Sequence, residues 1–180
     1  MKKLILSIGL LALSFAGETE AKVVYTQEQK EAIFIKQLKT DSLIEQKEGK
    51  FIEDVKIADV DYYVLYYSAS WCHPCRQFTP ILNSFYKEHY GKSKKTFEII
   101  LMSNDDSEKE MKEYMKKTNM PFKAAPYETS TFQLAYEVYP LKYLPSLVVL
   151  DGKGNVVASD VGQGDKDVYD VLKELEELLK

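Results

Sequence analysis

This sequence is poor in the residues that build metal sites and disulfide scaffolds. Among 180 residues there are only two cysteines, two histidines and one tryptophan. A structural zinc site needs four ligands, and the only histidines, His73 and His89, leave that supply short. Covalent haem attachment needs a histidine directly after the second cysteine, where this chain has Arg76. Neither kind of metal centre is therefore expected.

The sequence also lacks an excess of positive charge, low-complexity tracts and internal repeats. Its formal net charge is -4, with basic and acidic side chains interspersed, so nucleic acid is not expected as a partner. With 45% hydrophobic and 29% charged residues, the composition is that of an ordinary globular protein. The length suits a single domain, and we expect a monomer.

The first 21 residues are predicted to be a secretory signal peptide and not part of the fold. Lys2 and Lys3 form a positive start, residues 4–15 are an apolar run, and Ala16 and Ala21 are candidate cleavage positions. The apolar run is shorter than the about 20 residues that a membrane-spanning helix needs. We therefore expect export, to the periplasm or as a secreted protein, with cleavage after residue 16 or 21.

The rest of the chain alternates between helical and strand-like patterns. Residues 22–61 are predicted to be an N-terminal extension of the same domain, with one helix and two short strands, and residues 62–180 form its main part. In the first helix, Ile33, Phe34 and Leu38 are predicted to share the core-facing stripe. Helices are expected over residues 26–39, 75–90, 107–119, 131–137 and 166–180, and strands over 61–70, 97–103 and 146–159. This order predicts an α/β domain with a central mixed β-sheet flanked by helices.

Both cysteines lie in the stretch "SASWCHPCRQFTP", three positions apart. A disulfide across so small a loop removes little entropy from the unfolded chain, so it would stabilise the fold little. Cys72 falls at the end of a predicted buried strand and the start of a helix, where free N–H groups and the positive dipole end favour a thiolate. Because the thiolate is the attacking species, Cys72 is the predicted nucleophile. Cys75, one turn later, is the predicted resolving thiol.

The residues around the pair are predicted to support its chemistry. Trp71 is expected to shield and present the site, and Pro74 fixes the backbone between the cysteines. Two interpretations of His73 stay open: a protonated ring beside the Cys72 thiolate, which would make the pair more oxidising, or an exposed spacer. A passive disulfide would not explain the strand-to-helix placement, which favours a redox-active centre.

These motifs resemble the thioredoxin fold with a Trp-Cys-x-x-Cys-Arg active site, in which Arg76 is the final residue. Pro80, eight residues after Cys72, matches the helix-kinking proline of that fold. The segment "YLPSLVVLDGKGNVV" resembles its second signature, an apolar strand entered through a cis-proline. The resemblance assigns that role to Pro145. It also implies that the backbone of Leu144 pairs with a bound substrate strand.

The stretches "YYSASWCHPCRQFTPILNSFY" and "MPFKAAPY" are similar to the tryparedoxin and nucleoredoxin branch. Thioredoxin carries a buried aspartate six residues before its first cysteine, which assists proton transfer to the resolving thiol. Tyr66 stands at that position here, as it does in the tryparedoxin branch, and a tyrosine of ordinary pKa is a poor base. The proton acceptor is therefore not identified. Tryparedoxins serve a cytosolic dithiol cofactor, whereas similar exported reductases draw electrons from membrane carriers.

We therefore expect a thiol–disulfide oxidoreductase that reduces disulfides of exported proteins through a dithiol/disulfide cycle, with no metal or organic cofactor. Its electron donor is unknown, with a membrane thiol carrier as one candidate. Three alternatives stay open. They are a disulfide-forming oxidant or isomerase, a non-catalytic binding module whose disulfide stays closed, and a copper-handling module that uses the two cysteines and His73.

Overall fold

The computed structural model describes residues 24–161 and 166–180, so the predicted signal peptide lies outside the described residues. Within those ranges, the helices are α1 (Gln27–Thr40), α2 (His73–His89), α3 (Glu108–Thr118), α4 (Ser130–Val138) and α5 (Val168–Leu178). The strands are β1 (Leu43–Lys47), β2 (Lys50–Val55), β3 (Tyr62–Ser68), β4 (Phe97–Ser103), β5 (Lys123–Ala124), β6 (Ser146–Asp151) and β7 (Val156–Ser159). None of the helices in the described ranges has the length and apolar character needed to cross a membrane.

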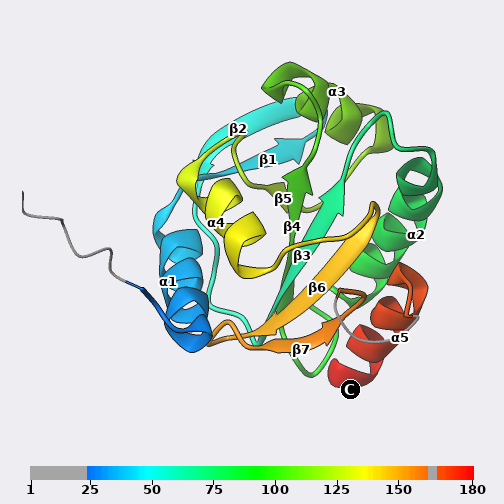
Figure 1. Ribbon diagram of the computed structural model, residues 1–180. Helices are drawn as coiled ribbons and strands as arrows, with labels where there is room; N and C mark the ends of the chain where they lie inside the picture. The colour runs from blue at the N-terminus through cyan, green and yellow to red at the C-terminus, as the bar shows by residue number, and fades with distance from the viewer. Residues whose placement is uncertain (1–23, 162–165) are drawn as a thin grey trace, which may run out of the picture.

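The strands form one mixed sheet in the order β2-β1-β5-β4-β3-β6-β7 (Figure 1). Strand β3 pairs parallel with β4 and antiparallel with β6. Side chains of α2, α3 and α5 form one hydrophobic core with one face of this sheet, and side chains of α1 and α4 form a second core with the other face. The predicted α/β architecture with a mixed sheet between helices is confirmed.

Strand β3 is buried on both faces, which explains its continuous run of apolar and aromatic residues. Successive side chains of a strand point to opposite faces. Val64 and Tyr66 accordingly contact the core under α2, α3 and α5, while Tyr63, Leu65 and Tyr67 contact the core under α1 and α4. Because β3 is fixed from both sides, its carboxyl end is a rigid support for the cysteine segment that follows.

Helix α1 begins at the predicted cap. Thr26 and Gln29 form a reciprocal capping box, in which each side chain accepts a hydrogen bond from the other residue's backbone N–H. Its core-facing stripe consists of Phe34, Ile35 and Leu38, whereas Ile33 is 38% exposed. The prediction for Ile33 was wrong because the stripe is centred one residue later, and a step of one residue turns a side chain by about 100° around the helix.

The N-terminal hairpin extends the sheet through a short strand that the sequence did not reveal. Strands β1 and β2 are joined at Glu48 and Gly49, which both have positive φ, as a tight two-residue hairpin turn requires. Strand β5, only Lys123 and Ala124, pairs with β1 on one side and β4 on the other. No strand is predicted from the sequence between residues 119 and 131, because two residues are too few to show the alternation that identifies a strand.

Candidate active site

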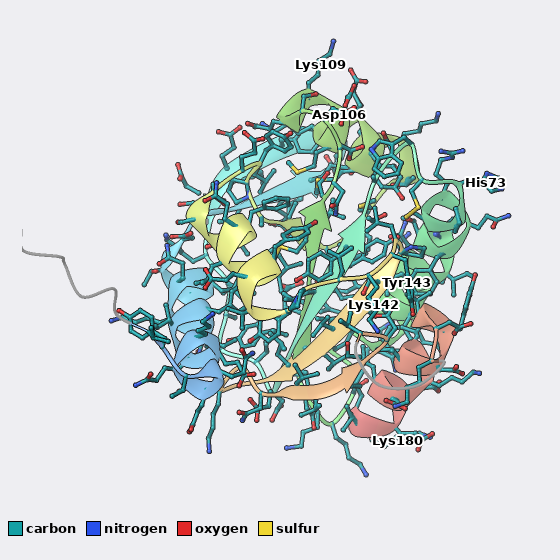
Figure 2. All side chains as sticks on the ribbon, viewed as in Figure 1. His73, Asp106, Lys109, Lys142, Tyr143 and Lys180 are labelled. Carbon is teal, nitrogen blue, oxygen red and sulfur yellow. A yellow bond between two sulfur atoms is a disulfide. The ribbon has the colours of Figure 1, made fainter. Side chains whose placement is uncertain are left out.

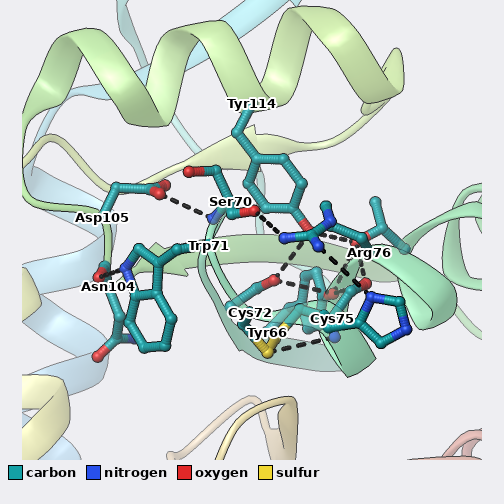
Figure 3. Close-up of a disulfide and its surroundings, with 12 residues drawn as sticks. Tyr66, Ser70, Trp71, Cys72, Cys75, Arg76, Asn104, Asp105 and Tyr114 are labelled. Carbon is teal, nitrogen blue, oxygen red and sulfur yellow. Dashed lines mark hydrogen bonds between the residues drawn. A yellow bond between two sulfur atoms is a disulfide. The ribbon is translucent and has the colours of Figure 1, made fainter.

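The two cysteines lie where β3 ends and α2 begins, joined by a disulfide with their Cα atoms 5.2 Å apart (Figure 3). Cys72 is the N-cap residue of α2, and its Sγ accepts a hydrogen bond from the backbone N–H of Cys75 at 3.2 Å. Cys75 is fully buried and Cys72 is 6% exposed. Cys72, the predicted nucleophile, is thus the more exposed of the two residues, and the roles of the two thiols stay predictions.

The first turn of α2 favours negative charge on the Cys72 sulfur. It carries no acidic side chain that would compete for the positive end of the helix dipole. His73 is exposed, as Figure 2 shows at the surface of α2, and its Nδ1 lies 3.4 Å from Nη2 of Arg76. This contact places the His73 ring at the surface beside Arg76, and both interpretations of His73 stay open.

The loop before Cys72 is held by a set of contacts that sequence reasoning did not find. The indole Nε1 of Trp71, a ring 59% exposed, donates to the carbonyl oxygen of Asn104 at 3.1 Å. The backbone N–H of Ser70 donates to Oδ1 of Asp105 at 2.7 Å, and the Ser70 carbonyl accepts from Nη1 of Arg76 at 2.7 Å. Figure 3 shows these bonds on both sides of the loop.

The sequence did contain a signal for the positions of Asn104 and Asp105. Asn104 and Asp105 directly follow β4, the parallel neighbour of β3. The carboxyl ends of parallel neighbouring strands meet at the same edge of a sheet, where functional groups gather in α/β folds. Polar residues after β4 could therefore have been expected beside the cysteine segment that follows β3.

Behind the disulfide, four buried hydroxyl groups form a closed ring. Tyr66 lies 2.8 Å from Thr79, Thr79 lies 2.6 Å from Tyr114, and Ser68 Oγ lies 3.0 Å from Tyr66 and 3.2 Å from Tyr114. Thr79 also donates to the carbonyl oxygen of Cys75 at 2.8 Å. Burial raises the pKa of Tyr66 well above its ordinary value. Tyr66 is therefore a hydrogen-bonding group, and no proton acceptor for Cys75 is assigned.

The predicted docking loop lies against the cysteines. The Leu144-Pro145 peptide bond is cis, as the resemblance implied. Leu144 packs against the buried cluster of Ala69, Cys72 and Cys75. Among the described residues, no group of three or more His, Cys, Asp or Glu side chains is placed to hold a metal ion.

A cysteine pair at a strand-to-helix junction, packed against a cis-proline loop, can interconvert between dithiol and disulfide. This arrangement defines the class of thioredoxin-fold thiol–disulfide oxidoreductases. The model of the thioredoxin-like family matches residues 59–156, more than half of the chain. The chain belongs to this thioredoxin-like family.

Individual relatives place it near the tryparedoxins and nucleoredoxins. Tryparedoxin from Trypanosoma brucei brucei is 39% identical over 88 residues, which is 48% of this chain. Probable nucleoredoxin 1 from Arabidopsis thaliana is 35% identical over 122 residues, or 67% of this chain. The matches span 58% of the tryparedoxin and 18% of the nucleoredoxin, so they are similarities of this domain and not of the whole relatives.

Solved structures of a thioredoxin and of a tryparedoxin resemble this protein. Thioredoxin from Wuchereria bancrofti superposes with a TM-score of 0.62 at 28% identity, covering 78% of this chain and 97% of that one. Native tryparedoxin I from Crithidia fasciculata gives a TM-score of 0.57 at 30% identity, covering 69% of this chain and 83% of that one. The predicted relation to the tryparedoxin and nucleoredoxin branch is confirmed, while export is not tested by these similarities.

Proposed function

We propose that this protein reduces disulfides of exported proteins, as a monomer and without a metal or organic cofactor. The observation that carries the proposal is the position of Cys72 at the N-cap of α2, with its sulfur accepting the Cys75 N–H and no acidic residue in the first turn. Such a position stabilises a thiolate. A closed structural disulfide would gain nothing from it.

The reaction is a two-electron exchange between sulfur atoms. The Cys72 thiolate attacks one sulfur of the substrate disulfide, the substrate S–S bond breaks, and the leaving thiolate takes up a proton. Cys75 then loses its proton and attacks the Cys72 sulfur, which releases the second substrate thiol. The substrate gains two electrons and two protons, and Cys72 and Cys75 become the disulfide that the structure contains.

The docking loop supports an extended protein substrate. Leu144 lies against the cysteines and is followed by Pro145 and then by β6, a position from which its backbone could pair with a substrate strand beside the reacting sulfur. The proposal of export rests on residues 1–21, and the periplasm is the compartment we propose. A membrane thiol carrier is the electron donor that fits this location.

The reduction potential of the Cys72–Cys75 pair tests the proposal directly. It would be measured in dithiothreitol buffers on protein that begins at Lys22, together with an insulin reduction assay that uses Cys72→Ser as the inactive control. A reductase is expected near the thioredoxin value of ~-270 mV. A value near ~-120 mV, as in a strong oxidant, would contradict the reductase direction. A pair with no turnover in the assay would instead support the non-catalytic module.

A further inference from the structure

The backbone of Ser70, the residue before the active-site tryptophan, is hydrogen-bonded through both its N–H and its C=O. The N–H of Ser70 donates to the Asp105 carboxylate at 2.7 Å, and its C=O accepts from the Arg76 guanidinium at 2.7 Å. The guanidinium of Arg76 is a charged donor, and hydrogen bonds from charged donors are stronger than neutral ones. Because Ser70 is two residues before Cys72, fixing its peptide also fixes the direction in which the chain enters α2.

Asp105 is a buried acidic residue beside the active-site loop. It is 4% exposed, and within the described ranges none of the ion pairs involves it. Among the residues that the structure describes, its oxygens accept the Ser70 N–H and the Ser103 hydroxyl, the latter at 2.7 Å. Burying a polar group is costly unless it is hydrogen-bonded, so these two bonds are what keeps the Asp105 carboxyl group in this position. The hydrogen bond from the Ser70 N–H to Asp105 fixes the position of Ser70.

The two hydrogen bonds of Ser70 do not involve the cysteine sulfur atoms, so reduction of the disulfide does not by itself break them. In the oxidised protein the Cys72–Cys75 bond itself fixes the first turn of α2. After reduction that cross-link is gone, and the nucleophile depends on the surrounding chain for its position. Asp105 and Arg76 are bound to the backbone of Ser70, and their bonds do not require the cysteines to be joined.

We propose that Asp105 is a positioning residue that keeps the Ser70–Cys72 segment in its attacking geometry when the disulfide is open. The inference rests on the proposed function, because it concerns the reduced form of the same site. It predicts that loss of Asp105 destabilises the reduced protein more than the oxidised one. A residue with a merely structural role would weaken both forms equally and leave the reduction potential unchanged.

Amide hydrogen exchange of Ser70 in the unaltered protein is the first test. The proposal expects the Ser70 N–H to be protected in both redox states. Rapid exchange of this amide in the reduced protein, with the amides of β3 still protected, would overturn it. This measurement needs no substrate, so it is independent of whether the protein reduces disulfides, and it remains decisive if a variant fails to fold.

Three variants provide the second test. Asp105→Ala is expected to shift the equilibrium of the cysteine pair with dithiothreitol about tenfold towards the disulfide, which is a potential about 30 mV more negative. Asp105→Asn keeps an oxygen that accepts the Ser70 N–H, so its reduction potential should stay close to that of the unaltered protein. Asp106→Ala is the matched control, since Asp106 is one residue further on and points to solvent (Figure 2).

The single tryptophan supplies a spectroscopic signature of the same segment. Trp71 is the only tryptophan in the chain, so its fluorescence reports on the active site alone. Asp105→Ala should lower the fluorescence anisotropy of Trp71 in the reduced protein, with little change in the oxidised protein or in Asp106→Ala. An unchanged reduction potential and an unchanged anisotropy in Asp105→Ala would overturn the proposal. An equal change of the reduction potential in Asp105→Ala and Asp105→Asn would also overturn it, because it would assign the effect to the charge of Asp105 and not to its hydrogen bond.

Discussion

Tyr66 shows how a single side chain can occupy a functional position without performing the expected chemistry. Thioredoxin has a buried aspartate at this point, which exchanges protons with the resolving cysteine. In this protein burial raises the pKa of Tyr66, and its hydroxyl bonds to Thr79, whose own hydroxyl reaches the carbonyl of Cys75. The tyrosine therefore supports the backbone of Cys75 and does not accept its proton.

Replacing Tyr66 with phenylalanine separates these two roles. Since the phenol stays protonated at neutral pH, Tyr66→Phe should leave the pH dependence of insulin reduction unchanged. The lost hydrogen bonds should lower the free energy of unfolding by about 1 kcal/mol, measured by urea denaturation. A pH profile displaced by the substitution would show instead that the phenol takes part in proton transfer.

At the scale of elements, a carboxylate joins the beginnings of β3 and β4. Asp61 precedes β3, and its Oδ2 accepts the backbone N–H of Thr96 at 2.8 Å and the Thr96 hydroxyl at 2.9 Å. The Thr96 backbone bond, then the Thr96 hydroxyl and Lys95, lower the pKa of Asp61 from 3.8. These bonds help to fix the register of β3 and β4 at the end of the strands opposite the cysteines. The register in turn determines the position of Asn104 and Asp105, which follow β4.

The lowered pKa of Asp61 gives a pH dependence of known sign. A carboxyl whose pKa is lower in the folded state stabilises the fold above its unfolded pKa and loses that contribution as the pH falls through the folded value. The difference in free energy of unfolding between the unaltered protein and Asp61→Ala should therefore be constant near neutral pH. It should shrink below pH 3.8.

Urea denaturation over a series of pH values measures this difference. Asp59→Ala is a suitable control, because Asp59 is a nearby exposed carboxylate that pairs only with Lys39 among the described residues. A stability difference for Asp61→Ala that persists unchanged well below pH 3.8 would mean that the Asp61 contribution does not depend on its charge.

At the scale of the whole molecule, the N-terminal extension is continuous with the sheet that carries the site. Strands β2 and β1 follow β5 in the sheet order, so they cover the edge that β4 and β5 would otherwise expose (Figure 1). Helix α1 packs beside α4 on the second core. Helix α1 and strands β1 and β2 thus share the sheet and the second core with the elements that carry the site.

Export is the prediction that belongs to this scale. In a bacterial host that processes secretory signals, the mature protein should begin at Gly17 or Lys22, which mass spectrometry of the periplasmic fraction would detect. Leu10→Arg should block export, because a charge interrupts the apolar run that the secretion machinery recognises. Recovery of the intact chain from the cytoplasm in both cases would contradict the assignment of residues 1–21.

The sequence by itself determined most of the helices and strands and the position of the cysteine pair. Apolar periodicity belongs to one helix or strand at a time, so it located β3, α2 and β4 closely, and the Cys72–Cys75 spacing at the strand-to-helix junction located the site. The resemblance to the thioredoxin fold added the cis bond before Pro145, which the structure contains. Each of these features depends on residues that are close in the chain or on a family motif.

Only the tertiary structure decided which side chains meet around the cysteines. Asp105 is 35 positions from Ser70, and Tyr114 is equally far from Thr79, so no local pattern connects them. The pairing register of β3 with β4 and the packing of α3 against α2 bring these groups together. Contacts of this kind arise from the relative placement of whole elements, and a periodicity confined to one element carries no information about that placement.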